Sequence, residues 1–530
     1  MTTQQEILLE TSKEFPDKRA LSFFKSTLTY SDLYRYSAAV ASQLSEYVRV
    51  GDTVAILMQN IPQFVMVQHA VWMLGCSILP MNPSYSAREI KYCLIDSGAK
   101  LVIAQSDALS RVKEASSSIS GIKVLATNPT TFSDIPSHLF EKWGFSECSE
   151  ELDFRSSSMT PVSSTPSESL AILVYTSGTT GNPKGAMVSH KNIYSSASIY
   201  KRWFKFTQHD SVLGFSPFFH ITGLVFHLAT ALLAGSHVVM RGRFDSELVL
   251  DSVEKEKTTV TMMAATAYIS LLNNPNIHQT DMSSMRLWSS GGMPVSRRLE
   301  ETWKDLTNSW IYVAWGLTET TSPATLWPYP YNGPLPVDGE TGIVSSGIPV
   351  YDTSLKIVDD NRAELPEGRV GEIAVKGPQV VSGYLNKPEA NKETFTDGWL
   401  YTGDIAKIER GWVFIIDRKK DMINSSGFKV WPREVEEVLY MHPCVSEAAV
   451  VGVEDFYRGE TVKAFIKLNQ DCQNSEAVKN SIVEHCRRYL APYKVPRQIE
   501  FIQDIPKTLS GKILKRVLKD RSSLSQTSSS

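Results

Sequence analysis

A segment rich in glycine and hydroxyl side chains, Thr176–Lys184 (TSGTTGNPK), has the composition of an anion-binding loop. The segment contains the glycines Gly178 and Gly181, the hydroxyl residues Thr176, Ser177, Thr179 and Thr180, and the lysine Lys184. A third glycine, Gly185, follows it directly. Glycines let several backbone N–H groups turn toward one point, and the lysine adds a positive charge. The Walker pattern needs a glycine before the lysine and a Ser or Thr after it, where this chain has Pro183 and Gly185. The segment therefore predicts a phosphate cradle of another design; the alternative is a flexible turn between two strands.

A second motif, AWGLTETT (Ala314–Thr321), follows a predicted strand. The Trp315 indole could stack on a nucleobase, and Thr318 could reach a phosphate. The Glu319 carboxylate could hold Mg²⁺, which prefers oxygen ligands and bridges phosphates. Taken alone, the motif reads equally well as a capped turn.

Two further motifs add a carboxylate and a lysine. In WLYTGD (Trp399–Asp404), the Asp404 carboxylate is expected after a tight turn, where it suits the two hydroxyls of a ribose. IPKTLSGKILKR (Ile505–Arg516) is a basic loop that contains Lys512, and a solvated surface is its simplest interpretation. Together with the first two, these motifs describe an ATP site with magnesium and two lysines. Because they are far apart in sequence, the fold has to bring them together.

Composition limits the other classes of function. The chain has 530 residues, too many for one core, with 42% hydrophobic and 21% charged residues and a net charge of −3. It has no long basic run, so we expect no nucleic-acid partner. Six cysteines without a C-x-x-C pair predict free thiols in a reducing compartment. The N-terminus lacks a signal-peptide pattern, no apolar run is long enough to span a bilayer, and the chain ends in Ser-Ser-Ser rather than the peroxisomal Ser-Lys-Leu. A cytoplasmic protein is therefore expected.

The pattern of elements predicts an α/β protein with two unequal domains. Strands and helices alternate over residues ~20–110 and again after Leu170–Tyr175, which indicates two mainly parallel sheets covered by helices. Short alternating strands over ~340–416 indicate an antiparallel or barrel-like segment. The expected domains are 1–417, a small mobile α+β domain at 418–521, and a disordered Ser-rich tail at 522–530.

The order and wording of these motifs resemble the adenylate-forming enzymes, the superfamily of acyl-CoA synthetases, firefly luciferase and peptide-synthetase adenylation domains. The resemblance runs from about Tyr30 to Arg516 and rests on YTSGTTGNPKG and on YTGD, DRKKDMI, SGFKV, PREVE and PKTLSGK in that order. Within the superfamily the chain looks closest to medium- and long-chain fatty acyl-CoA ligases and their 4-coumarate–CoA ligase-like relatives.

The resemblance implies two half-reactions: a carboxylate and ATP give acyl-AMP and pyrophosphate, and coenzyme A then takes the acyl group. Thr176–Lys184 would wrap the β- and γ-phosphates. Trp315 would stack on adenine, where the family more often has tyrosine. The roles implied for the other residues are as follows: Gly291, Gly292, Met293 and Gly316 around the base, Thr318 on the α-phosphate, Glu319 and Thr176 on magnesium, Asp404 and Arg418 on the ribose, and Lys512 between carboxylate and α-phosphate.

For the second half-reaction, the resemblance implies a rotation of the C-terminal domain about Lys420. Gly427 and Lys429 would then approach coenzyme A. Aryl-CoA ligases often have a lysine where this chain has Asn424. His220, in SPFFHITG, is a core histidine on the simplest interpretation, and the resemblance gives it a positioning role between acyl pocket and adenylate.

The segment FFHITGL (Phe218–Leu224) has no carboxylate to pair with an ammonium, which disfavours an amino-acid substrate. The small and apolar residues expected around the acyl group favour a medium- or long-chain fatty acid, and a flat aromatic acid fits the same composition. An acyl-AMP ligase that loads a carrier protein, a luciferase-like oxidoreductase and a non-catalytic nucleotide-binding protein are the other interpretations. A homodimer is left open.

Overall fold

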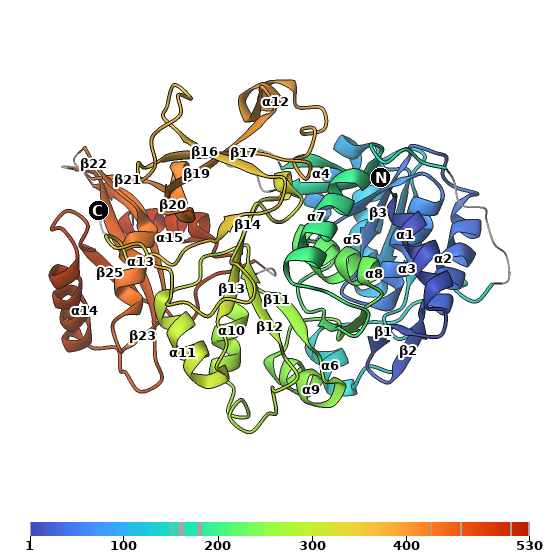
Figure 1. Cartoon of the computed structure of the whole chain (residues 1–530), viewed down its shortest axis with the longest axis horizontal. Coiled ribbons are helices and arrows are strands. Elements are labelled where there is room, and N and C mark those ends of the chain that lie inside the picture. Colours follow the sequence, from blue (N-terminus) through green and yellow to red (C-terminus); the bar gives the residue numbers. More distant parts are fainter. Residues whose placement is uncertain are drawn as a thin grey trace.

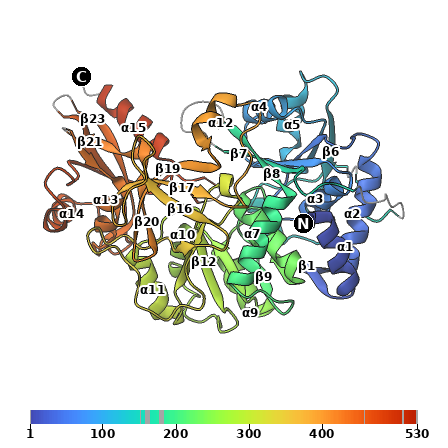
Figure 2. The same ribbon diagram turned by 45° about the horizontal axis from the view of Figure 1, so that its top comes forward.

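The computed structural model describes residues 2–149, 152–156, 164–176, 183–425, 427–455, 458–508 and 511–527. Figures 1 and 2 show an elongated molecule, with the first hundred residues at one end and the segment after Ile423 at the other. Of the motifs singled out from the sequence, Ala314–Thr321 and Trp399–Asp404 lie between these two ends, and Ile505–Arg516 belongs to the C-terminal segment.

The sheet nearest the N-terminus has the strand order β6-β5-β3-β4-β7-β8. Its strands are β3 (Thr53–Leu57), β4 (Ser77–Pro80), β5 (Leu101–Gln105), β6 (Lys123–Thr127), β7 (Leu170–Thr176) and β8 (Lys184–Ser189). Its pairings are parallel except between β7 and β8. The helices in the same part of the chain are α1 (Gln4–Glu14), α2 (Tyr30–Leu44), α3 (Pro62–Met73), α4 (Ala87–Ser97), α5 (Leu109–Ser116) and α6 (Ser137–Lys142). The last of these, α6, is tied by the Lys142–Asp245 ion pair to the part of the chain that forms the second sheet. Every residue of α3 is buried, so the helix can be apolar on all its faces.

A second sheet has the order β15-β14-β13-β12-β11-β9-β10-β1-β2, and its middle strands are parallel. Its strands are β1 (Arg19–Phe23), β2 (Ser26–Thr29), β9 (Ser211–Leu213), β10 (His237–Met240), β11 (Val260–Met263), β12 (Leu287–Gly291), β13 (Ile311–Trp315), β14 (Thr325–Leu326) and β15 (Ile348–Pro349). Its helices are α7 (His190–Trp203), the π-helix η2 (Gly223–Ala229), α8 (Thr230–Ala234), α9 (Ser246–Glu256), α10 (Ala265–Leu272) and α11 (Arg297–Thr307). The two predicted parallel sheets are confirmed.

The antiparallel segment expected over ~340–416 is also present. It has the order β16-β17-β19-β18, with β20 beside β19. The strands are β16 (Ser354–Val358), β17 (Gly371–Lys376), β18 (Phe395–Thr396), β19 (Trp399–Glu409) and β20 (Trp412–Arg418), and α12 (Pro388–Thr394) precedes β18.

The C-terminal segment forms a sheet with a core of its own. The strands are β21 (Ile423–Ser425), β22 (Phe428–Val430), β23 (Val445–Asp455), β24 (Gly459–Leu468) and β25 (Gln498–Phe501), packed with α13 (Pro432–Tyr440), α14 (Glu476–Tyr489) and α15 (Lys515–Thr527). The buried side chains of this core come from Ile423 to Val495 and are separate from the large N-terminal core. A large domain and a small one are therefore present, as expected; the boundary after residue 417 stays a prediction.

Two expectations differ from the structure. Cys444 and Cys472 form a disulfide between the start of β23 and the turn after β24. The prediction of free thiols was therefore wrong for this pair, because the β23–β24 hairpin brings together residues 28 apart in sequence. The tail was expected to be disordered from residue 522, yet α15 continues to Thr527. Among the helices described, none is long and apolar enough to cross a membrane.

Candidate active site

A pocket opens at the carboxyl ends of the parallel strands β12 and β13, where ligands of open α/β sheets usually bind. It lies next to the loop that carries Lys512. Its lining residues are Tyr200, His220, Ile221, Thr222, Met262, Gly291, Gly292, Ala314, Trp315, Gly316, Leu317, Thr318, Ser322 and Lys512. Of the residues singled out from the sequence, His220, Gly291, Gly292, Trp315, Gly316, Thr318 and Lys512 thus share one pocket.

Lys512 reaches this pocket from the C-terminal domain. A short hairpin holds it: Lys507 bridges Ile513, and the Thr508 hydroxyl accepts from the Lys512 backbone N–H at 3.1 Å. Gly511 has φ +86° and passes so close to α10 that a Cβ there would lie 2.4 Å from the Thr266 hydroxyl. A glycine is therefore required for this approach. The expectation of a solvated basic loop is excluded for Lys512.

The lysine is surrounded by charged groups. Burial and the Arg418 guanidinium lower the pKa of Lys512 to about 8, while Asp404 and Glu319 act in the opposite direction. Lys420 is also close enough to lower the Lys512 pKa, and its own pKa is lowered by burial and by Arg418. Three cationic side chains, Lys512, Arg418 and Lys420, are therefore close together beside the carboxylates of Asp404 and Glu319, and a cluster of cations suits a phosphate.

Asp404 is held by two neighbours. Its Oδ2 accepts a hydrogen bond from the Trp315 indole Nε1 at 2.9 Å, and its Oδ1 lies 3.9 Å from the Arg418 Nε. Burial raises the pKa of Asp404, and Arg418 opposes this. The carboxylate lies inside β19, paired in register with Arg418 of β20, rather than after a turn. Gly403, at φ +71°, provides the local irregularity that the sequence suggested as a turn.

Glu319 has a partner that sequence reasoning missed. The Tyr384 hydroxyl donates to the Glu319 Oε1 at 2.6 Å, and both side chains are buried. Burial and the carboxylate raise the pKa of Tyr384, so its hydroxyl keeps its proton and donates. The Lys184 ammonium lies 5.1 Å from the centre of the same ring. Tyr384 thus connects the lysine of the first motif to the carboxylate of the second.

The predicted phosphate loop is described at its two ends. β7 and β8 form an antiparallel hairpin in which Thr176 pairs with Lys184. The Thr176 hydroxyl is 3.5 Å from the Lys184 carbonyl oxygen, at the outer limit of a hydrogen bond. Ser177, Gly178, Thr179, Thr180 and Gly181 lie outside the described residues. The two flanking strands are present as predicted, and both the phosphate role and the alternative of a flexible turn stay predictions.

His220 is uncharged. Its Nδ1 accepts from the Thr222 backbone N–H at 3.3 Å, which puts the ring proton on Nε2. Burial, with a contribution from Lys512, lowers the pKa of His220 to about 3. The segment turns sharply here, since a Cβ on Gly223 would meet the Pro217 carbonyl oxygen at 2.1 Å. His220 can therefore donate a hydrogen bond as a neutral ring.

Predicted site residues that are absent from the pocket lining include Glu319, Asp404 and Arg418, described above, as well as Gly427, Lys429 and Met293. Gly427 and Lys429 are exposed on the β21–β22 hairpin of the small domain. Met293, after β12, is half-buried against the large core and is absent from the lining. If Gly427 and Lys429 act in the same reaction, the small domain has to move relative to the large one.

The residues present fit a magnesium ion that arrives with its nucleotide. Within the described ranges, no group of three or more His, Cys, Asp or Glu side chains could hold a metal ion. Glu319 offers one carboxylate, with one of its oxygens bonded to Tyr384. Magnesium is commonly held by one or two carboxylates plus substrate phosphates, so one well-placed carboxylate is sufficient.

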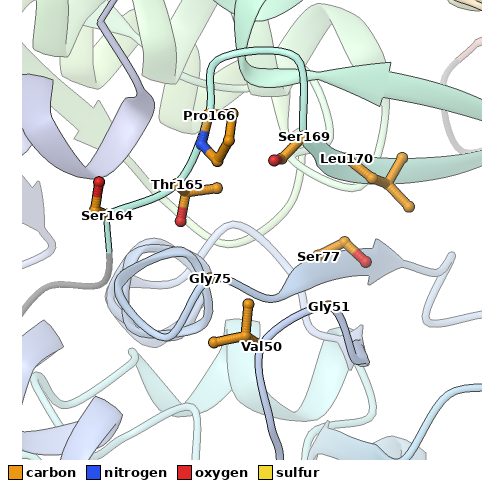
Figure 3. A pocket seen from close by; sticks show the side chains of 9 residues that line it. All are labelled: Val50, Gly51, Gly75, Ser77, Ser164, Thr165, Pro166, Ser169 and Leu170. Atoms are coloured by element: carbon orange, nitrogen blue, oxygen red, sulfur yellow. The ribbon is translucent and has the colours of Figure 1, made fainter.

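A second hollow lies elsewhere, between the turns that precede β3 and β4 and the segment leading into β7 (Figure 3). Its lining contains Val50, Gly51, Gly75, Ser77, Ser164, Thr165, Pro166, Ser169 and Leu170. None of these side chains is charged, and the hydroxyls are the only polar groups among them. The chemistry indicated by the sequence is therefore in the pocket of Lys512.

Comparison with known proteins defines the class. Residues 8–385 match the family model "AMP-binding enzyme", and residues 434–512 match its C-terminal domain. The chain is 33% identical to a long-chain-fatty-acid–CoA ligase of Bacillus subtilis, over 97% of this chain and 94% of that protein. It is also 33% identical to a 4-coumarate–CoA ligase of Humulus lupulus, over 93% of this chain and 88% of that protein.

Solved structures give the same result. An anthranilate CoA ligase in complex with anthranoyl-AMP aligns with a TM-score of 0.89 at 26% identity, covering 99% of this chain and 98% of that one. Two structures of MatB from Rhodopseudomonas palustris also align, each at 28% identity and covering 98% of this chain and 99% of that one. The TM-score is 0.85 for the ATP-bound form and 0.74 for the form without ligand. Because both forms are the same protein, the difference lies in conformation, and this chain is closer to the ATP-bound arrangement.

The chain belongs to the AMP-binding enzyme family, within the adenylate-forming superfamily. Within that superfamily it is an acyl-CoA synthetase, grouped with the fatty-acid and 4-coumarate CoA ligases.

Proposed function

We propose that this enzyme joins a carboxylic acid to AMP at the expense of ATP, and then transfers the acyl group from acyl-AMP to coenzyme A. The observation that carries the proposal is the position of Lys512. This ammonium enters, from the C-terminal domain, a pocket at the ends of β12 and β13, with the Asp404 and Glu319 carboxylates close enough to influence its pKa.

In the first half-reaction, a carboxylate oxygen of the acid bonds to the α-phosphorus of ATP and pyrophosphate leaves. No covalent enzyme intermediate is needed, so the protein contributes position and charge. The Lys512 ammonium bridges the carboxylate and the α-phosphate, and Thr318 contacts the α-phosphate. Lys184 and the segment Thr176–Gly181 hold the β- and γ-phosphates, which depart together.

The nucleoside is held by a second group of residues. Asp404 accepts hydrogen bonds from the ribose hydroxyls, and Arg418 lies beside it. Trp315 covers one face of the adenine, and Gly291, Gly292, Met293 and Gly316 surround the base. Glu319, together with Thr176, would hold the magnesium ion, which when bound supplies positive charge to the phosphate oxygens.

In the second half-reaction, the C-terminal domain (418–521) rotates about Lys420, withdraws Lys512 and presents Gly427 and Lys429. The exposure of both residues and the closer likeness to ATP-bound MatB support an adenylation arrangement before that rotation. His220 positions the acyl-adenylate as a neutral hydrogen-bond donor.

The acid has no charged group besides its carboxylate, because the lining contains no charged side chain besides Lys512. A medium- or long-chain fatty acid is supported by the name of the Bacillus subtilis relative, and an aryl acid by the names of the hop relative and the anthranilate ligase. Coenzyme A is the proposed acceptor, with a carrier protein as the alternative.

A pyrophosphate-release assay tests this function. Purified enzyme is given ATP, Mg²⁺ and one acid from a panel of acetate to palmitate, benzoates, cinnamates and amino acids, with and without coenzyme A. Repeated turnover that needs coenzyme A and yields AMP supports the proposal. Pyrophosphate in a single stoichiometric burst, unaffected by coenzyme A, would favour a carrier-protein acceptor. No pyrophosphate with any acid would refute the proposal.

A further inference from the structure

The pocket continues from Lys512 to a pair of buried hydroxyls. A Cβ added at Gly292 would lie 3.7 Å from the Lys512 Cε, so the lysine passes beside this glycine. A Cβ added at Gly291 would lie 3.4 Å from the Met262 Sδ. The Tyr200 hydroxyl in turn is 3.8 Å from the Met262 Sδ and 2.8 Å from the Ser322 Oγ. These contacts lead from the lysine, past the two glycines, to Tyr200 and Ser322.

The Tyr200 end of the pocket is closed. The Tyr200 ring stacks on Phe204 with centroids 6.1 Å apart and meets the edge of Phe226 at 5.1 Å. Phe204 also contacts Tyr312 and Tyr329. Tyr200, Phe204 and Phe226 are almost completely inaccessible to solvent. Since protein cores are close-packed, a chain that extends beyond Tyr200 would have to displace these rings.

The hydroxyl pair has hydrogen-bonding capacity left over. Burial raises the pKa of Tyr200, so its phenol stays protonated. Tyr200 and Ser322 together carry two hydroxyl hydrogens, and the bond between them uses one. When Ser322 donates to Tyr200, the Tyr200 hydrogen has the Met262 Sδ at 3.8 Å as its acceptor, and a thioether is a weak one. A substrate atom that hydrogen-bonds here would complete the pair, whereas a methyl group would leave it incomplete.

We propose that this end of the pocket selects a compact aromatic carboxylic acid with a hydroxyl substituent opposite the carboxylate, and excludes straight acyl chains of fatty-acid length. Tyr200 is the specificity-determining residue: its ring limits the length of the acid, and its hydroxyl recognises the substituent together with Ser322. This inference rests on the proposed function and adds the substrate class to it.

The test compares hydroxylated and plain acids in wild-type enzyme and variants. The acids are 4-hydroxycinnamate, cinnamate, 4-hydroxybenzoate, benzoate, hexanoate, decanoate and palmitate, each measured as kcat/KM for AMP formation with coenzyme A. We expect the better hydroxylated acid to exceed its plain counterpart by tenfold or more. Tyr200→Phe and Ser322→Ala should each reduce this ratio severalfold, mainly through the hydroxylated acid. Tyr200→Ala should gain activity with decanoate.

A matched control is Tyr30→Phe, which also removes a buried hydroxyl, one that donates to the Ser236 carbonyl at 2.6 Å outside the pocket lining. Its substrate ratios should equal those of the wild type, and thermal melting shows whether each variant is folded. Palmitate or decanoate as the best wild-type substrate would overturn the inference and leave the proposed function intact. An unchanged ratio in Tyr200→Phe would overturn the role of the hydroxyl. No AMP formation with any acid would instead refute the proposed function.

Discussion

The Tyr384 hydroxyl donates a hydrogen bond to the Glu319 carboxylate at 2.6 Å, between residues 65 apart in the sequence. The same ring faces the Lys184 ammonium, and the backbone on either side of Tyr384 is bonded to β8, from Leu385 N–H to Gly185 and from Met187 N–H to Gly383. One tyrosine thereby fixes the proposed magnesium carboxylate relative to the strand that carries the phosphate-loop lysine.

Tyr384→Phe is expected to lower kcat of adenylation by about tenfold, because a hydrogen bond to a charged group contributes about 1.5–3 kcal/mol and the ring is retained. The Mg²⁺ concentration for half-maximal rate should rise, since Glu319 would be less well oriented. Steady-state rates over a magnesium titration measure both effects. Tyr30→Phe serves as control, and an equal loss in that variant would mean that stability, rather than the site, is responsible.

Lys512→Ala is expected to lower the rate of acyl-AMP formation by at least a hundredfold, and to leave thioester formation from preformed acyl-AMP within a few-fold of wild type. The reason is that Lys512 lies in the pocket in the arrangement seen here, and the proposed rotation would withdraw it before thioester formation. Lys429→Ala should show the reverse pattern, because Lys429 is exposed and outside the pocket. The two half-reactions are assayed separately. Equal losses of both steps in either variant would contradict the rotating-domain account.

The pH dependence follows from the lysine. Burial and Arg418 lower the pKa of Lys512 to about 8. The charged form stabilises the transition state, so kcat/KM for adenylation should fall as pH rises through about 8. Lys512→Arg keeps its charge to much higher pH, and its residual activity should lack this alkaline decline. A wild-type profile that is flat to pH 10 would exclude Lys512 as the titrating group in the free enzyme.

Trp315→Phe is expected to raise KM for ATP about five- to tenfold, with KM for the acid nearly unchanged, because the variant keeps an aromatic face and loses the N–H bonded to Asp404. In an Asp404→Asn background the same change should have a smaller effect, which a double-mutant cycle measures. Additive effects of the two substitutions would show that the indole acts on adenine alone.

The disulfide should stabilise the small domain. Cys444 and Cys472 are 28 residues apart, and closing a loop of this length is expected to contribute about 3–4 kcal/mol through the unfolded chain. Cys472→Ser, or reduction of the wild type, should therefore lower the midpoint of thermal unfolding. Cys148→Ser, at a thiol outside the disulfide, is the control and should respond to reductant like the wild type. Equal melting with and without reductant would show that the bond is not formed in solution.

Much of the architecture follows from local sequence patterns. Apolar strands alternating with helices predicted both parallel sheets, because each strand must be buried on two faces. The shift to short alternating strands after ~340 predicted the antiparallel sheet. Pocket residues at the carboxyl end of a strand, such as Gly291 and Trp315, could be placed in advance, because parallel strands bring their carboxyl ends to one edge.

Other features depend on contacts between distant residues, and no local period encodes them. Tyr200 and Ser322 are 122 apart in sequence, and their hydroxyl pair exists only because α7 packs beside the loop after β13. Asp404 was expected after a tight turn, and only the pairing of β19 with β20 places it opposite Arg418. Cys444 and Cys472 form a disulfide because the pairing of β23 with β24 brings their side chains together.

The sequence by itself therefore determined the class of chemistry, because phosphate, ribose and carboxylate each require particular side chains in recognisable local settings. Only the tertiary structure decided how the groups are arranged: which hydroxyl holds Glu319, which indole holds Asp404, and where the pocket of Lys512 ends. The physical reason is that hydrogen bonds and packing act over a few ångströms in space, while sequence patterns report only on neighbours along the chain.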